Sequence, residues 1–282
     1  MRTKLSMLAA VALALAILGV VTPTLSADPL GPVPTGWACN GSCGTDGSDG
    51  VVPVTGALPN STYEWVSTYD PTINTTTGNF ANYGVGALPN NALGGETNGS
   101  TLATSTFTVT DNSTLNFYFD YVTSDGADSM TNYADYAWAA LFDQNGNLVS
   151  LLFTARTEPT GTVVPGPGMP NPTATLDPTS VTMSSGTTWS PLGPDSGSCY
   201  GPGCGNTGWV DTTYNIATGG TYYLEVGVVN WNDQLYNSGL AMDGVAINGV
   251  DIDPSGMPEP GTWLMLAIGV ASVLVLRRKR LA

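Results

Sequence analysis

Histidine is absent from the chain, and this limits the chemistry that its side chains can perform. Without histidine there is no Ser-His or Cys-His nucleophile pair and no imidazole to act as a general base. A pair of carboxylates could still hydrolyse a glycosidic bond, but no spacing marks any two of the 22 Asp and Glu residues as such a pair. We therefore expect a protein that is not an enzyme. A glycan-active enzyme with paired carboxylates is kept as an alternative.

Two groups of acidic residues could instead bind a hard cation: Asp120, Asp125 and Asp128, and later in the chain Asp233 and Asp243. Carboxylate oxygens in loops between strands are the ligands that Ca²⁺ prefers. The same side chains also cap turns by accepting hydrogen bonds from their own backbone. The sequence leaves both interpretations open, so Ca²⁺ is the one cofactor that it suggests.

Four aromatic residues lie in or beside polar segments, where their rings could contact a sugar: Trp189, Trp209, Trp231 and Tyr236. Aromatic rings offer apolar faces to sugar C–H groups and polar edges to hydroxyls. In an all-β protein, however, aromatic side chains more often fill the core. These residues are therefore candidates for glycan binding, with core packing as the alternative.

The four cysteines form two close pairs in Gly-rich segments, Cys39 with Cys43 and Cys199 with Cys204. In an exported chain they are expected to be oxidised to two disulfides. Four cysteines allow three connectivities. Proximity favours pairing within each segment, whereas bridges between the segments would close longer loops and stabilise more. A structural zinc site is the further alternative, although the spacings differ from those of C-x2-C knuckles.

The residues around these candidates predict strands. Apolar and polar residues alternate over 106–110 and 115–122, as in half-buried strands. An Asn-Gly pair at 145–146 separates the apolar runs 136–142 and 148–154, which predicts a β-hairpin. Further strands are expected at 63–69, 174–183, 209–216, 221–229 and 239–247. Loops are expected over 29–53, from the end of the strand at 63–69 through Gly99, and over 159–172. This pattern predicts an all-β fold, an antiparallel, jelly-roll-like β-sandwich.

Both ends of the chain are typical of export signals. Arg2 and Lys4 precede an apolar run and the small residues up to Ala27, so residues 1–27 are expected to be a signal peptide. The ectodomain is then 28–255. Residues 256–282 contain Pro258, Glu259 and Pro260, then 14 apolar residues, and then the cluster Arg277, Arg278, Lys279 and Arg280. The apolar run would form a helix of about 21 Å, shorter than the roughly 30 Å hydrocarbon core, which suits a transient transmembrane helix.

Charge is distributed unevenly between the ends and the ectodomain. All 22 acidic residues lie between Asp28 and Glu259, where Arg156 is the one basic residue. Such a surface repels phosphate backbones, so nucleic acid is excluded as a partner. The terminal basic cluster is expected to stay on the cytoplasmic side of a membrane, which places the ectodomain outside.

The C-terminal tripeptide, apolar segment and basic cluster resemble the sorting signal of PEP-CTERM proteins. The region between the ends also resembles an uncharacterised PEP-CTERM family, through Tyr-Val-Thr-Ser-Asp-Gly at 121–126, Asp-Tyr-Ala-Trp at 135–138, Gly-Met-Pro at 168–170 and Asn-Trp-Asn-Asp at 230–233. The resemblance implies a Gram-negative exporter in which an exosortase processes the tail after transient anchoring in the inner membrane. It also implies an association with extracellular polysaccharide.

These observations together predict an exported protein of the cell surface or extracellular matrix that is not an enzyme. Its expected partners are an exosortase, through residues 256–282, and exopolysaccharide. A Ca-dependent carbohydrate-binding module is the main alternative.

Overall fold

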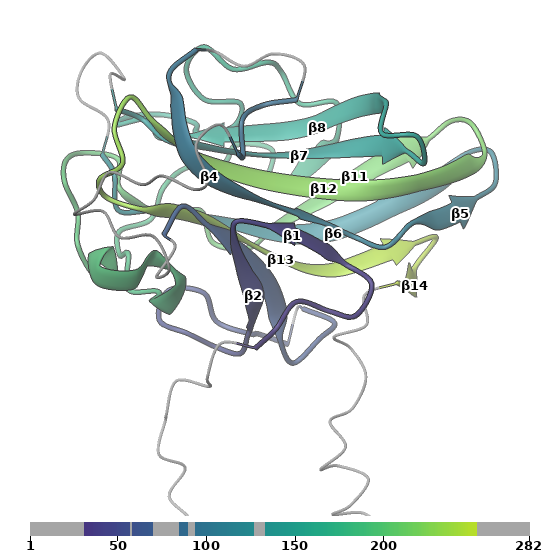
Figure 1. Ribbon diagram of the computed structural model, residues 1–282, viewed down its shortest axis with the longest axis horizontal. Helices are drawn as coiled ribbons and strands as arrows, with labels where there is room; N and C mark the ends of the chain where they lie inside the picture. Colours follow the sequence, from purple (N-terminus) through teal and green to yellow (C-terminus); the bar gives the residue numbers. More distant parts are fainter. Residues whose placement is uncertain (1–30, 57, 70–84, 90–93, 127–132, 253–282) are drawn as a thin grey trace, which may run out of the picture.

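Two antiparallel β-sheets stacked face to face make up the protein in the computed structural model (Figure 1). The structure describes residues 31–56, 58–69, 85–89, 94–126 and 133–252. The predicted signal peptide and the sorting tail lie outside these residues, as do the expected cleavage site and the terminal apolar segment. None of the helical segments among the described residues is long and apolar enough to cross a membrane.

The first sheet has six strands, and its main path runs in the order β1-β4-β12-β7-β8, with β5 paired to β12. Its members are β1 (Ala38–Asn40), β4 (Glu96–Ala103), β5 (Phe107–Val109), β7 (Tyr136–Asp143), β8 (Leu148–Arg156) and β12 (Gly220–Trp231). The long strand β12 lies at the centre, between β4 and β7. It therefore carries side chains along most of the length of the sheet.

The second sheet has eight strands in the order β2-β3-β13-β6-β11-β9, with β10 beside β6 and β14 beside β13. Its members are β2 (Ser42–Asp46), β3 (Tyr63–Ser67), β6 (Ser113–Thr123), β9 (Thr175–Asp177), β10 (Gly205–Asn206), β11 (Val210–Ile216), β13 (Ser238–Ile247) and β14 (Val250–Asp251). Both ends of the described chain join this sheet. Gly31 bridges to Thr45 on β2, and Ile252 donates a backbone hydrogen bond to Val245 on β13.

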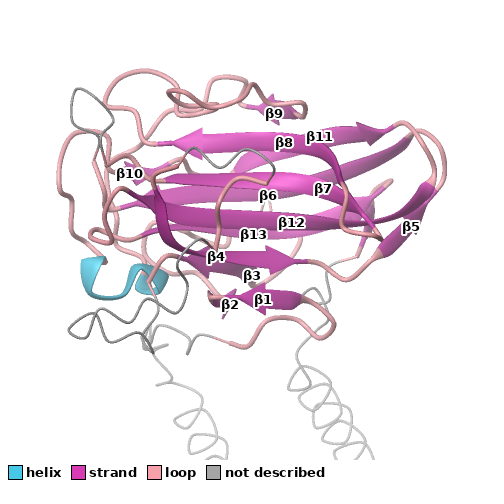
Figure 2. Ribbon diagram, turned by 45° about the horizontal axis from the view of Figure 1, so that its top comes forward, coloured by secondary structure: helices cyan, strands magenta, loops and turns pink. Residues whose placement is uncertain are grey.

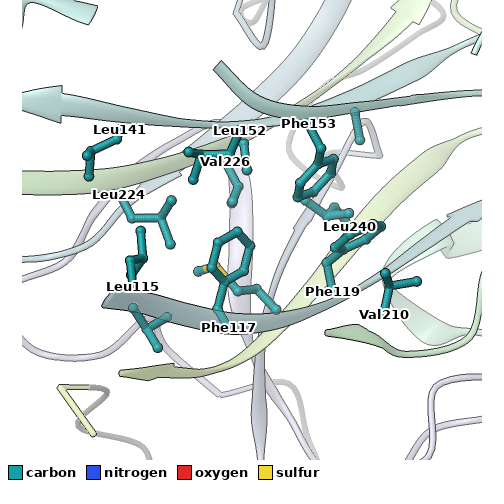
Figure 3. Close-up of a cluster of buried hydrophobic side chains, with 14 of the residues drawn as sticks. Leu115, Phe117, Phe119, Leu141, Leu152, Phe153, Val210, Leu224, Val226 and Leu240 are labelled. Carbon is teal, nitrogen blue, oxygen red and sulfur yellow. The ribbon is translucent and has the colours of Figure 1, made fainter. Parts of the chain in front are cut away.

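Alternating side chains of the two sheets meet in one apolar core (Figure 3). Phe117 and Phe119 point inward from β6, and Leu224 and Val226 point inward from β12. The ring of Phe153 on β8 stacks on that of Phe119, with centroids 3.9 Å apart. Because side chains in a strand alternate between faces, the residues between these positions must point to the outside of the sandwich.

Loops cover part of each outer face and create two smaller apolar clusters. Outside the eight-stranded sheet, Tyr63, Trp65 and Val122 pack against Trp189 and Leu192. The last of these belongs to a short 3₁₀ segment, η2 (Ser190–Asp195). Outside the six-stranded sheet, residues of β7 pack against Leu88 and Met169 in the flanking loops. The sandwich is therefore thicker than two bare sheets.

The predicted sandwich is confirmed, and so are most of its strands. The hairpin around Asn145-Gly146 joins β7 to β8, and the alternating runs near 106–110 and 115–122 became β5 and β6. Three expectations were wrong. The expected loop 29–53 contains β1 and β2, the expected loop up to Gly99 includes the start of β4, and the strand expected over 174–183 is only the three-residue β9.

Two disulfides join neighbouring cysteines, Cys39 to Cys43 and Cys199 to Cys204. This is the pairing that proximity in the sequence favours. The first bridge links β1 of the six-stranded sheet to β2 of the eight-stranded sheet across the turn at Gly41, whose φ is +99°. A local bridge thus ties the two layers together at one edge of the sandwich.

Candidate functional site

A shallow groove lies on the outer face of the six-stranded sheet, over β1, β4 and β12. Its volume is about 360 Å³, which is within the range of sites for small ligands. The side chains that line it are mostly small or polar, with one ring and one carboxyl: Ala38, Cys39, Asn40, Thr101, Ala103, Thr104, Thr106, Tyr223 and Glu225.

Strand alternation explains why these side chains reach the surface. Leu224 and Val226 of β12 point into the core, so Tyr223 and Glu225 point outward. On β4, Leu102 is buried in the core, and Thr101 and Ala103 face the groove. The register places Glu225 directly opposite Ala103. The groove therefore depends on the pairing of two strands that are far apart in the sequence.

Tyr223 supplies the aromatic surface of the groove. Its ring stacks on that of Phe142 from β7, with centroids 5.2 Å apart and planes 9° from parallel. Phe142 is 7% exposed and is part of the apolar cluster outside this sheet. A ring supported in this way loses little freedom when a ligand binds to it.

Glu225 supplies the charge of the groove. The side chain is half-buried, and this desolvation raises the pKa of its carboxyl, against the opposing effect of a hydrogen bond from Thr101. Carboxylate oxygens accept hydrogen bonds from hydroxyl groups, and threonine hydroxyls both donate and accept. An aromatic face beside such groups has the chemistry that a sugar ring requires.

The four aromatic residues predicted to bind glycans lie in different places. Trp189 is completely buried and donates through Nε1 to the hydroxyl of Tyr63 at 2.8 Å, so it is a core residue and not a surface platform. Trp209 is half-buried, edge-on to Tyr63. Trp231 lies 4.6 Å below the guanidinium of Arg156. None of these three lines the groove.

The fourth candidate, Tyr236, has an exposed partner that the sequence did not single out. Its ring centroid lies 4.7 Å from that of Tyr200, and Tyr200 is 55% exposed. The pair lies in loops at the end of the sandwich. Tyr200 follows Cys199 directly and so belongs to the loop closed by the second disulfide.

The acidic residues predicted to bind Ca²⁺ do not gather at one place in the described part of the chain. Asp120 accepts a hydrogen bond from Thr207, Asp243 accepts one from Asn60, and both are buried. Asp125 is also buried, and Asp233 is half-buried and accepts from the backbone of Leu235. Within the described ranges, no three His, Cys, Asp or Glu side chains are grouped to hold a metal ion. Asp128 lies outside these ranges, and Ca²⁺ binding stays a prediction.

Sequence reasoning missed a buried polar group at one end of the core. Asp135 accepts hydrogen bonds from the backbone N–H of Trp231 at 2.8 Å and the hydroxyl of Ser238 at 2.6 Å. Burial, followed by the charge of Asp125, raises the pKa of Asp135 well above its usual range. In the sequence, Asp135 stands out only by its position directly before the strand predicted to begin at Tyr136. That position does not distinguish a buried carboxyl from an exposed one.

Arg156 is the one basic residue among the described residues, and it is only 6% exposed. Its guanidinium donates to the carbonyl oxygens of Ala134 at 3.0 Å and Pro167 at 3.1 Å. The described surface therefore presents acidic side chains with almost no basic group between them. This is a stronger asymmetry than the sequence alone implied, because the single cation is hidden.

Comparison with known proteins identifies the tail. The PEP-CTERM protein-sorting motif matches residues 258–280. No curated protein sequence matches the chain.

Solved structures with a similar chain path include two cleaved adhesin domains, K1 and K3, of Lys-gingipain from Porphyromonas gingivalis W83. They are 11% and 9% identical to this chain, cover 76% and 79% of it and 91% and 98% of their own lengths, and each has a TM-score of 0.34. The enzymatically active domain of bacteriophage CBA120 tailspike protein 4 is 12% identical over 76% of this chain and 19% of its own, with a TM-score of 0.30. These likenesses add nothing about ligands.

Proposed function

We propose that this PEP-CTERM protein is a non-enzymatic protein of the cell surface or matrix that binds exopolysaccharide through the groove on its six-stranded sheet. The motif at 258–280 indicates an exported protein, transiently anchored in a membrane, whose processing partner is an exosortase. The sorting signal accounts for delivery. The function of the protein after export therefore has to come from the ectodomain.

The observation that carries the proposal is the chemistry of the groove. Tyr223 offers a ring supported by Phe142, and Glu225 offers a half-buried carboxylate. Threonine and asparagine side chains add polar groups, and small residues line the rest. Sugars bind to such surfaces by stacking a pyranose face on the ring while their hydroxyls bond to the polar groups. A shallow groove that is open to solvent also suits a long chain, because the chain can lie across it.

The charge of the ectodomain restricts the kind of polysaccharide. Arg156, the one basic residue of the described chain, is buried, and Glu225 places an acid in the groove itself. Uronic acid or sulfate groups would be repelled by this field. We therefore propose that the ligand is an uncharged polysaccharide or one that bears amino groups.

The test is a titration of the mature exported protein against exopolysaccharide extracted from the producing cells. Tyr223→Ala should weaken binding at least about tenfold, which corresponds to about 1.4 kcal/mol, since truncating a central aromatic hot-spot residue costs about 2 kcal/mol or more. Glu225→Gln should weaken it as well. Tyr118→Ala, which removes a half-buried tyrosine from the outer face of β6 in the other sheet, is the matched control and should bind like the unmodified protein.

Unchanged binding by both groove variants would refute the proposal. Two further readouts separate the alternatives. Loss of binding in a chelator would favour a Ca-dependent module, and release of new reducing ends from the polysaccharide would favour a glycan-active enzyme.

A further inference from the structure

A second aromatic surface, made of one exposed ring and one half-buried ring, lies on the loops beside the disulfide of Cys199 and Cys204. The rings of Tyr200 and Tyr236 are 4.7 Å apart and inclined by 30°. Tyr200 is 55% exposed, and Leu235, next to Tyr236 in the chain, is 62% exposed. Large apolar side chains with this exposure are few among the described residues. We call Tyr200 and Tyr236 the tyrosine pair.

Both loops of the tyrosine pair are fixed to the same point of the sandwich. The backbone N–H of Tyr200 donates to the carbonyl oxygen of Ser124 at 3.0 Å. The hydroxyl of Ser124 in turn donates to the carbonyl oxygen of Asn237 at 2.8 Å. Asn237 also donates through its backbone N–H and its side-chain amide to Asp195. The rings are thus held before any ligand arrives, which lowers the entropy cost of binding.

The surroundings of the tyrosine pair fit a sugar better than a protein. Two rings and one leucine cover far less than the roughly 800 Å² per partner that a stable protein interface buries. Asp195, at the end of η2, is hydrogen-bonded to Asn237, next to Tyr236, and Asp233 lies in the loop of Tyr236. Carboxyl groups can accept hydrogen bonds from sugar hydroxyls. A single pyranose ring needs no larger surface than a stacked ring and such neighbours provide.

The tyrosine pair lies far from the groove. Strand β12 passes the groove at Tyr223 and Glu225 and runs away from it to Trp231, six residues beyond Glu225. At about 3.3 Å per residue, this stretch alone spans about 20 Å. Tyr236 follows β12, and Tyr200 is bonded to Ser124 at the end of β6 where β10 pairs. Figure 2 shows β10 and β5 at opposite ends of the sandwich. The groove lies toward the β5 end, because Thr104 and Thr106 in the segment just before β5 line it.

We propose that the tyrosine pair contacts a second polysaccharide segment, so that one ectodomain bridges two segments and cross-links the polymer. The inference rests on the proposed function of the groove, which supplies the first contact. The disulfide between Cys199 and Cys204 then has a binding role, because it closes the loop that presents Tyr200.

The test measures binding and bridging separately, with the mature protein and exopolysaccharide extracted from the producing cells. Light scattering of the polymer should rise as protein is added. It should fall again at excess protein, because each polysaccharide segment is then bound by a separate protein molecule and none is bridged. The double variant Tyr200→Ala, Tyr236→Ala should keep binding within about threefold of the unmodified protein and lose the rise in scattering. The pair Cys199→Ser, Cys204→Ser should weaken the rise, and the control Tyr118→Ala should leave it intact.

The outcomes distinguish the two proposals. If Tyr223→Ala abolishes binding while the tyrosine-pair variant still cross-links the polymer, the bridging inference is wrong and the proposed function stands. If Tyr223→Ala and Glu225→Gln bind normally, the proposed function fails whatever the tyrosine pair does. Sedimentation of the protein without polymer tests whether the protein associates with itself, which could also cross-link the polymer. A dimer that becomes a monomer in the tyrosine-pair variant would make the pair a self-association contact and overturn the inference.

Discussion

Asp120 is an acidic side chain placed where charge is costly. It is completely buried on β6, opposite Ala241 of β13. Its Oδ1 accepts a hydrogen bond from the hydroxyl of Thr207 at 3.1 Å, and no residue in the described ranges donates to Oδ2. Desolvation raises the pKa of this carboxyl from 3.8 to about 7, against the smaller effect of the bonds from Thr207 and Gly208.

This burial predicts a pH dependence of stability with a definite sign. Between pH 3.8 and about 7 the unfolded chain has lost the proton of Asp120 and the folded protein has kept it, so the free energy of unfolding falls as pH rises. Asp120→Asn cannot ionise. The variant should therefore gain stability relative to the unmodified protein over this window, by up to about 1.4 kcal/mol for each pH unit, in urea unfolding at pH 4.5, 6 and 8.

Asp143→Asn is the control for this series. Asp143 lies in the exposed hairpin turn, where hydrogen bonds from Asn147 lower the pKa of its carboxyl. Because its pKa is lowered and not raised, this carboxyl does not hold its proton into the window, so the stability difference of this variant should stay nearly constant from pH 4.5 to 8. A constant difference for Asp120→Asn as well would show that the buried carboxyl is ionised throughout.

Strands β12 and β7 fit together through a glycine on one strand and a tryptophan on the other. Gly227 lies opposite Trp138 of β7, whose indole crosses over the glycine and donates through Nε1 to the carbonyl oxygen of Gly86 at 2.7 Å. A Cβ atom at Gly227 would lie 2.5 Å from an indole carbon. The absence of a side chain at this position is therefore what allows the ring to lie flat on the outer face of the sheet.

Gly227→Ala should lower the free energy of unfolding by about 1–3 kcal/mol, the usual cost of overpacking, measured by chemical denaturation. The fluorescence of Trp138 should change with it. Gly56→Ala is the control, since a Cβ atom there meets nothing within 4 Å. A Gly227→Ala protein as stable as the unmodified one would mean that the indole moves aside without loss.

Strands in which apolar and polar residues alternate could be predicted from the sequence, and strands that form only because neighbouring strands pair with them could not. The runs at 115–122 and 221–229 alternate well enough to identify β6 and β12. Strand β4 has the sequence Glu-Thr-Asn-Gly-Ser-Thr-Leu-Ala, in which apolar and polar residues hardly alternate. It is a strand because β1 and β12 pair with it on either side.

The candidate site escaped prediction for the same reason. Neither Tyr223 nor Glu225 differs in sequence from other residues on the polar face of a strand. They form a groove only because the register sets Glu225 against Ala103 and because Phe142 lies under the ring of Tyr223. Tyr236 could be named from its polar setting, but its partner Tyr200 is brought to it by folding.

At the scale of the whole molecule, the tail and the ectodomain carry out separate tasks. Replacing Pro258, Glu259 and Pro260 together with alanine should leave the protein in the membrane fraction with its tail intact, because the sorting motif spans 258–280. Cell fractionation and mass spectrometry of the mature C-terminus measure this. Pro254→Ala, just before the motif, is the control and should be exported normally. Normal release of the triple variant would contradict the role of the tripeptide.

The two ends of the described chain, at Gly31 and Ile252, both join the eight-stranded sheet. Anything attached behind Ile252 is therefore fastened to that layer, and the other layer lies about 10 Å farther away. Copies fixed to a cell through their C-terminal ends would all stand with the same polarity, eight-stranded sheet inward and groove outward. Such a coat would have a direction, with the proposed polysaccharide-binding groove on the layer farther from the point of attachment.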